Sequence, residues 1–93
     1  MKTFDDLRND LASEDPLRYI SLEIAGKLIA ARNRKGISQK ELSELSGTPQ
    51  KTISRIENGI DVPKLPTLIK LSSALDLQLE FALTEKNKED VLH

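Results

Sequence analysis

The chain has 93 residues, of which 38% are apolar and 3% aromatic, a net charge of −1 and no cysteine. These values predict one small domain with an aliphatic core, expected in the cytoplasm because no segment is apolar enough for a signal peptide or a membrane span. The lack of cysteine excludes disulfides and thiolate metal sites, and with His93 as the single histidine we expect no enzyme, metal, cofactor or small-molecule ligand.

A short helix is predicted over about residues 4–13, within an N-terminal segment that spans residues 1–15. Thr3 and Asp6 have the spacing of a capping box, with Asp in place of the usual Glu. The apolar residues of this helix recur at helical spacing: Phe4, Leu7 and Leu11.

A long helix follows, from Pro16 to the residue before Gly36. Asp15 is a good cap, proline is favoured at the first helical position, and Gly36 is typical of the left-handed residue that ends a helix. The apolar residues of this helix step by three or four and are expected to form its inner face: Leu17, Ile20, Ile24, Leu28 and Ala31.

The stretch from Ser38 to Gly59 contains two short helical patterns on either side of a tight turn. Ser38 begins the first helix with a capping box, and Gly47 turns the chain. The second helix is predicted over residues 49–58. Such a pair lets one helix brace another, so that the second can enter the major groove of DNA.

A last helix is predicted over about residues 65–75, and the period of the apolar residues then changes from helical to alternating. The alternation predicts a half-buried strand over residues 77–85, with one apolar side. That side consists of Leu77, Leu79, Phe81 and Leu83. A lone strand needs a partner, and the economical one is the same strand of a second copy across a two-fold axis. An extended tail, or a helix that continues to Leu79, is the alternative. Residues 86–93 are predicted to be a flexible tail.

Charge is distributed unevenly along the chain. Residues 26–64 carry eight basic and four acidic side chains (net +4), whereas residues 1–25 carry three and six (net −3) and residues 65–93 carry three and five (net −2). A basic middle facing phosphates would explain this pattern, and chance among solvated charges is the alternative.

Three motifs fall at the spacing of a known family. They are Gly-Ile-Ser-Gln-Lys-Glu-Leu, Ser-Gly-Thr-Pro-Gln-Lys-Thr-Ile-Ser-Arg-Ile-Glu-Asn-Gly and Pro-Lys-Leu-Pro-Thr-Leu-Ile-Lys-Leu. From about Leu28 to Leu79 the chain resembles the Cro/C1-type (XRE family) helix-turn-helix domains. The resemblance implies an all-α, lambda-repressor-like DNA-binding domain over residues 16–76, which binds palindromic operators as a dimer.

The chain departs from that family at three positions. The family usually has alanine where this chain has Ser43, and an aliphatic residue where it has Ser46. A serine or threonine often caps the recognition helix where this chain has Pro49. We therefore expect Thr48 to cap that helix instead.

Three side chains of the predicted recognition helix are expected to read bases: Gln50, Lys51 and Arg55. Glutamine can bond adenine through N6 and N7, and arginine or lysine can bond guanine O6 and N7. In the family the matching positions face base edges. The alternative for Gln50 and Lys51 is that they are solvated first-turn residues.

Seven polar side chains are expected to contact the DNA backbone. Gln39 begins the first helix of the pair, where free N–H groups favour a phosphate oxygen, and the resemblance implies that it also braces Gln50. The other six are hydroxyl residues of the recognition helix or residues near helix ends: Thr52, Ser54, Asn58, Lys64, Arg34 and Lys35. An ordinary surface position is the alternative for each.

Arg32 and Glu57 are expected to have a structural role. In the family the matching residues form a partly buried ion pair that joins the first helix to the recognition helix. The resemblance therefore implies the same pair here, and removing one partner would leave the other charge poorly compensated.

The acidic N-terminal helix indicates a protein partner. Together with the C-terminal strand, it resembles the architecture of HigA- and HipB-type antitoxins. That resemblance implies a homodimeric antitoxin that represses its own operon and neutralises a toxin, an mRNA endonuclease, bound at Phe4, Leu7 and Leu11. Packing of this helix on its own domain alone is the alternative.

Two further functions stay open at this point. One is a stand-alone or phage-type repressor without a toxin, and the other is an interaction adaptor that no longer reads DNA. The expected partners are double-stranded operator DNA, a second copy of the chain and a cognate toxin, with no membrane.

Overall fold

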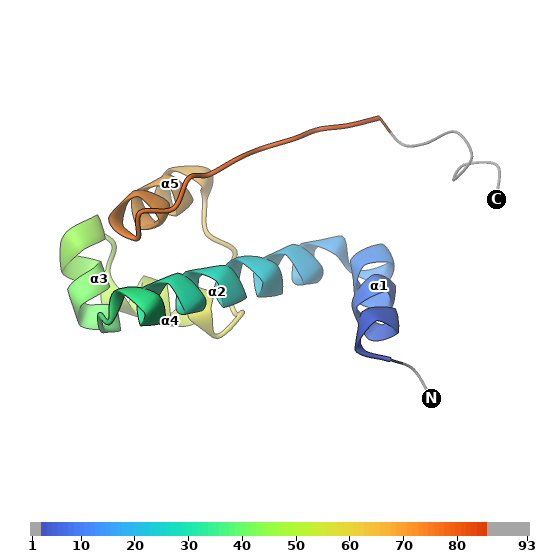
Figure 1. The fold of residues 1–93 in the computed structure, drawn as a ribbon, viewed down its shortest axis with the longest axis horizontal. Coiled ribbons are helices and arrows are strands. Elements are labelled where there is room, and N and C mark those ends of the chain that lie inside the picture. The colour runs from blue at the N-terminus through green and yellow to red at the C-terminus, as the bar shows by residue number, and fades with distance from the viewer. Residues whose placement is uncertain (1–2, 86–93) are drawn as a thin grey trace.

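The described part of the chain is all-helical. The computed structural model describes residues 3–85, and the predicted flexible tail, residues 86–93, lies outside the described residues, as do residues 1–2. The helices within that range are α1 (Phe4–Glu14), α2 (Pro16–Lys35), α3 (Gln39–Ser46), α4 (Gln50–Glu57) and α5 (Leu65–Ala74) (Figure 1). Each predicted helix is therefore confirmed, with small shifts at its ends.

Local signals set the ends of the first two helices. The capping box between Thr3 and Asp6 is formed, with hydrogen bonds of 3.1 and 3.2 Å. Asp15 caps α2 by accepting the N–H of Arg18 at 3.1 Å. Gly36 ends α2 at φ 72°, in the left-handed region that strains any residue with a β-carbon.

An aliphatic core lies where α2, α3, α4 and α5 meet. Leu42 of α3, Ile53 and Ile56 of α4 and Leu71 of α5 are at most 1% exposed. The remaining buried members of this core are Leu28, Ala31 and Leu75. Burying one such side chain contributes about 1.5–3 kcal/mol, so the core holds α3 and α4 firmly against α2.

The N-terminal half of α2 extends beyond this core and carries α1 at its far end (Figure 1). Arg8 of α1 donates to Glu23 of α2 at 2.8 Å. Leu17 and Ile20, predicted to face inward, are 64% and 50% exposed. That prediction is wrong because α2 is longer than the bundle that covers it, so Leu17 and Ile20 lie beyond the core.

The C-terminal strand predicted over residues 77–85 is wrong: residues 3–85 contain no strand. α5 ends at Ala74, and the N–H of Leu77 donates to Ser72 at 2.8 Å. Beyond Leu77 the chain leaves α5 as an extended segment, residues 78–85, that runs toward the α1 end of the molecule (Figure 1). A strand needs a neighbouring strand to pair its backbone groups, and no other described part of this chain supplies one. The alternative of a helix that continues to Leu79 is also wrong.

Candidate nucleic-acid interface

Helices α3 and α4 form a helix-turn-helix unit. Ser38 caps α3 by accepting the N–H of Glu41 at 3.0 Å, and the Glu41 carboxylate accepts the N–H of Ser38 at 3.1 Å. Ile53 and Ile56 lock one face of α4 into the core. Helical periodicity then places Gln50, Lys51 and Arg55 on the exposed side of α4.

Side-chain hydroxyls hold the turn between α3 and α4. Ser43 donates to the carbonyl of Thr48 at 2.6 Å. Ser46 donates to the carbonyl of Leu42 at 2.7 Å and accepts the N–H of Thr48 at 3.2 Å. Gly47, at φ 72°, allows the sharp change of direction. Ser43 and Ser46 are two of the three residues that depart from the family pattern. Their side chains form hydrogen bonds that fix the angle between the two helices.

The prediction that Thr48 caps α4 is wrong. Pro49 occupies the capping position, and no side chain caps this helix. Thr48 is 4% exposed, and its Oγ1 has no hydrogen-bond partner in the described structure. Hydrogen bonds between the Ser43 and Ser46 side chains and the backbone of Thr48 hold Thr48 in the turn, where its own side chain is buried.

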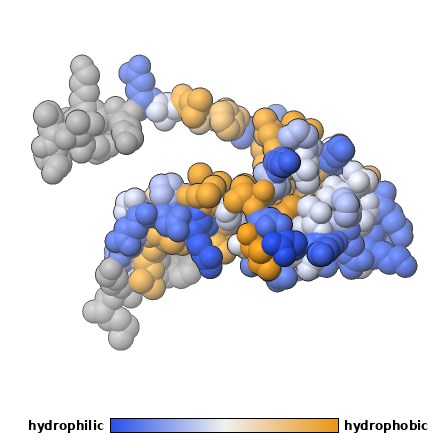
Figure 2. All heavy atoms as spheres, turned by 180° about the vertical axis from the view of Figure 1, so that it is seen from behind, coloured by the Kyte–Doolittle hydropathy of each residue, from blue (hydrophilic) through white to orange (hydrophobic). Residues whose placement is uncertain are grey.

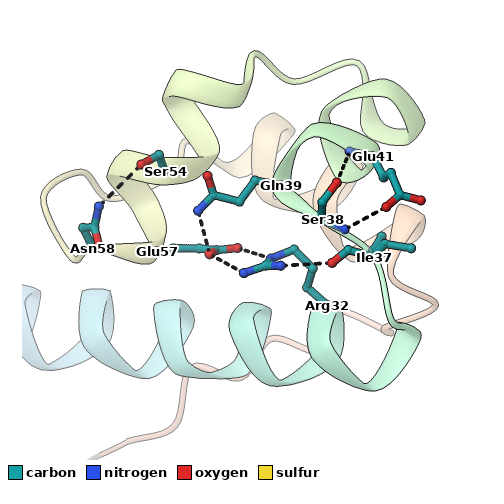
Figure 3. Close-up of polar contacts among 8 residues, drawn as sticks. All are labelled: Arg32, Ile37, Ser38, Gln39, Glu41, Ser54, Glu57 and Asn58. Carbon is teal, nitrogen blue, oxygen red and sulfur yellow. Dashed lines mark hydrogen bonds and ion pairs between the residues drawn. The ribbon is translucent and has the colours of Figure 1, made fainter.

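A polar network joins α2 to α4 through Arg32 and Glu57 (Figure 3). Arg32 donates from Nε and Nη2 to the two Glu57 oxygens, at 2.7 and 3.0 Å, and from Nη1 to the carbonyl of Ile37 at 3.0 Å. The two side chains are 15% and 6% exposed. Gln39 donates to Glu57 Oε1 at 3.0 Å, so its amide is held on Glu57, whereas the resemblance placed it on Gln50.

This network perturbs the ionisation of both partners. Burial acts to raise the pKa of Glu57, but the hydrogen bonds from Arg32 and Gln39 outweigh it, and the pKa lies below its usual value. The bond to Glu57 raises the pKa of Arg32. The pair is therefore charged at neutral pH and fixes the position of α4 against α2.

Arg55 is the one predicted base-reading residue with an intramolecular ion pair among the described residues. Its Nε donates to Asp61 Oδ2 at 2.6 Å and its Nη2 to Asp61 Oδ1 at 3.2 Å. This contact lowers the pKa of Asp61 and raises that of Arg55. Sequence reasoning missed Asp61, since a loop residue six positions away has no periodic relation to the helix.

The predicted backbone-contacting residues lie in three places. Thr52, Ser54 and Asn58 lie on or at the end of α4, with Asn58 donating to Ser54 at 3.4 Å. Lys64 precedes α5 and lines, with Thr52, a hollow beside the loop after α4. These four residues are therefore grouped around α4 and the loop that follows it.

Lys35 and Arg34 lie elsewhere. Lys35 donates to the carboxylate of Asp76 at 2.7 Å and to the carbonyl of Ala74 at 3.1 Å, so its ammonium ties the end of α2 to the end of α5. Arg34 lines a groove between α2 and the chain that follows α5. The structure thus does not bring these two residues together with α4.

A second surface lies at the junction of α1 and α2. Leu7 and Leu11, two of the three predicted toxin contacts, line a hollow with Tyr19 and Leu22. The side chain of Phe4, the third, lies outside the described part of the structure. Leu7 is 55% exposed, so the packing of α1 on α2 leaves part of its apolar stripe uncovered.

Residues 3–85 lack the features of a membrane span and of a metal site. None of the helices there combines the length and hydrophobicity needed to cross a bilayer. The same residues contain no group of three or more side chains that could hold a metal ion.

Comparisons with known proteins point to one family. A family model described as Helix-turn-helix matches residues 28–81. An uncharacterized HTH-type transcriptional regulator of Haemophilus influenzae is 39% identical over 74 residues, which cover 77% of this chain and 76% of that protein. The HTH-type transcriptional regulator y4dL of Sinorhizobium fredii is 41% identical over 66 residues, 71% of this chain but 34% of that protein. The antitoxin HipB of Escherichia coli is 33% identical over 61 residues, 66% of this chain and 65% of HipB. No solved structure matches the chain.

Proposed function

The chain belongs to the helix-turn-helix family, and on this premise we propose that it is a transcriptional regulator that reads operator DNA with α4. The observation that carries the proposal is the orientation of α4. Ile53 and Ile56 anchor it, which turns Gln50, Lys51 and Arg55 outward. A helix held in this way can enter the major groove with its N-terminal residues first.

The chemistry of these three side chains suits base edges. Gln50 pairs with adenine, and Arg55 or Lys51 pairs with guanine, each well-formed pair discriminating by about 1–3 kcal/mol. Thr52, Ser54, Asn58 and Lys64, which surround α4, serve as contacts to phosphates. Phosphate contacts set affinity and its dependence on salt, whereas base contacts set sequence preference.

We propose that the regulator acts as a homodimer formed through the extended segment. Within it, Leu79, Phe81 and Leu83 are 40%, 80% and 89% exposed. Figure 2 shows hydrophobic atoms along this segment, away from the body of the molecule. Packing against the same segment of a second copy would cover these apolar side chains. Two α4 helices about 34–36 Å apart would then read half-sites one helical turn apart.

An antitoxin role is the finer proposal. It draws support from the similarity to HipB, a protein named as an antitoxin, and from the uncovered apolar surface between α1 and α2. In this role a toxin, an mRNA endonuclease, binds at Leu7, Leu11 and Phe4, and the dimer represses the operon that encodes both proteins. The acidic charge of residues 1–25, three basic against six acidic side chains, suits a basic toxin.

A stand-alone repressor is the second candidate. It is favoured by the relatives from Haemophilus influenzae and Sinorhizobium fredii, both named as transcriptional regulators. Co-expression with the product of the adjacent gene separates the two. The antitoxin role predicts a complex that survives purification and is lost in the double substitution L7D/L11D, whereas the stand-alone role predicts none.

Selection from a random DNA library tests the shared part of the proposal. The wild-type protein should enrich a palindromic sequence, and the variant Q50A/K51A/R55A should bind it only as weakly as unrelated DNA. The control K27A/K70A also removes two positive charges, at exposed positions outside α4, and should retain the sequence preference. Full binding by the α4 variant would show that another surface reads the DNA.

A further inference from the structure

The loop after α4 folds back on the last turn of that helix. The N–H groups of Ile60 and Asp61 both donate to the carbonyl of Arg55, at 2.9 and 3.3 Å. Gly59, at φ 72°, permits this reversal. The backbone therefore places the Asp61 carboxylate directly beside the Arg55 side chain.

The contact between the two side chains uses one particular edge of the guanidinium group. Asp61 accepts from Nε at 2.6 Å and from Nη2 at 3.2 Å. A guanidinium carries five N–H donors, so both donors of Nη1 and one of Nη2 remain. These three lie at the end of the side chain, where the fork of Nη1 and Nη2 meets O6 and N7 of guanine.

We propose that Asp61 is a specificity-determining residue, which holds Arg55 in position for bidentate recognition of a guanine in the operator. The proposal rests on the proposed function, since it assigns a role within the same DNA-reading surface. Of the two basic side chains on α4, it assigns Arg55 to a guanine in each half-site. It also adds a residue that acts on recognition through Arg55 and not through a contact of its own.

Two physical effects support this role. An arginine side chain has many rotamers, and a carboxylate that fixes one of them removes most of the ordering cost of binding. Both side chains are accessible, with 45% and 44% of their surface exposed, so the free edge of Arg55 can meet a base. Asp61 also brings a negative charge near the phosphates, which weakens binding to every sequence alike.

Because of this charge, removing Asp61 changes DNA binding in one way if Asp61 positions Arg55, and in another way if Asp61 competes with DNA for Arg55. If Asp61 merely competed with DNA for Arg55, its removal would strengthen binding to the operator and leave or sharpen the preference for guanine. If Asp61 positions Arg55, its removal weakens the preference for guanine while binding to random DNA stays equal or becomes tighter. The ratio of affinities for operators that differ at one base pair is therefore the informative quantity.

The test uses the operator enriched by the wild-type protein and its single base-pair variants, with affinities from fluorescence anisotropy. R55A first identifies its base pair, as the one where discrimination falls about tenfold or more. D61A is expected to lower discrimination at that same guanine by about threefold to tenfold, and at no other position. E44A, which removes an exposed carboxylate from α3, is the matched control and should change no preference. In R55A/D61A the second substitution should cause no further loss of discrimination at any base pair.

The outcomes separate the two claims. Unchanged or sharper discrimination in D61A, or an effect at a base pair that R55A does not affect, overturns the role of Asp61 and leaves the proposed function standing. A position read by Arg55 that is not guanine also overturns it. If the wild-type protein enriches no sequence, the proposed function fails and the role of Asp61 fails with it.

Discussion

Replacing Glu57 with alanine removes the carboxylate that joins α2 to α4. Arg32 then keeps only its bond to Ile37, and Gln39 loses its acceptor. Loss of one partner of a buried ion pair costs about 3–5 kcal/mol, and the 15% exposure of the Arg32 side chain lets water recover part of that. We therefore expect a loss of about 2–4 kcal/mol.

That loss is large for a domain of this size. Natural domains are stable by about 0.05–0.15 kcal/mol per residue, so this chain has about 5–14 kcal/mol in total. The melting temperature should fall by about 10–25 °C, which thermal and urea unfolding followed by circular dichroism will measure. E44A is the control, because Glu44 is exposed on α3, and it should change stability by less than about 0.5 kcal/mol.

A double substitution tests whether the loss comes from the orphaned charge. R32M/E57L replaces the pair with apolar side chains and should be more stable than E57A by about 1–3 kcal/mol, because no buried charge is left alone. A loss below about 1 kcal/mol in E57A, or no recovery in the double variant, would mean that this pair does not hold α4 in place.

Four further predictions concern Glu57, Thr48, Gly59 and the extended segment. The pKa of Glu57 lies below its ordinary value of 4.5, so the stability that charged Glu57 contributes is complete above that pH and is lost as the pH falls through the lowered pKa. In acid titrations the free energy of unfolding of the wild-type protein should fall in this range, and that of E57Q should fall less steeply. T48V replaces the buried, unpartnered hydroxyl of Thr48 with a methyl group and should stabilise the protein by about 1 kcal/mol in urea unfolding; destabilisation would mean that the hydroxyl has a partner. G59A should lose at least about 1 kcal/mol, because the residue lies at φ 72° and a β-carbon there would lie 3.0 Å from Leu22; equal stability would contradict this geometry. Removing residues 77–93 should give a monomer in sedimentation, and a truncated protein that stays dimeric would refute the extended segment as the interface.

Local interactions made most of the fold predictable from the sequence. The capping boxes at Thr3 and Ser38 join residues three positions apart, so their geometry depends on little beyond the backbone between them. The glycine at 36 likewise ends α2 through its own φ angle. Helix positions and most of the core followed, because apolar residues at helical spacing must share one face.

The wrong predictions concern groups whose state depends on distant or missing partners. Alternating residues beyond Leu75 predict a strand, but a strand exists only where a second one lies beside it. Thr48 has the chemistry of a cap, yet Ser43 and Ser46 bond its backbone and the turn buries its side chain. Leu17 has the spacing of a core residue, but the bundle ends before it.

The candidate interface was predictable in part. Ile53 and Ile56 are three positions apart, so the sequence predicts that both face inward and that the opposite face of α4 is exposed. The pairing of Arg55 with Asp61 was not predictable, because it depends on how the loop after Gly59 folds back. The ion pair between Lys35 and Asp76 was not predictable either, because the two residues lie forty-one positions apart in the chain.

Chemical footprinting of the enriched operator shows whether α4 reads base edges in the major groove. Dimethyl sulfate methylates guanine N7 in the major groove, the atom that Arg55 is proposed to bind. We expect protection of a guanine in each half-site, about one helical turn apart, that is lost in R55A and retained in K27A/K70A. Protection that persists in R55A and in Q50A/K51A/R55A, or protection confined to adenines in the minor groove, would contradict this expectation.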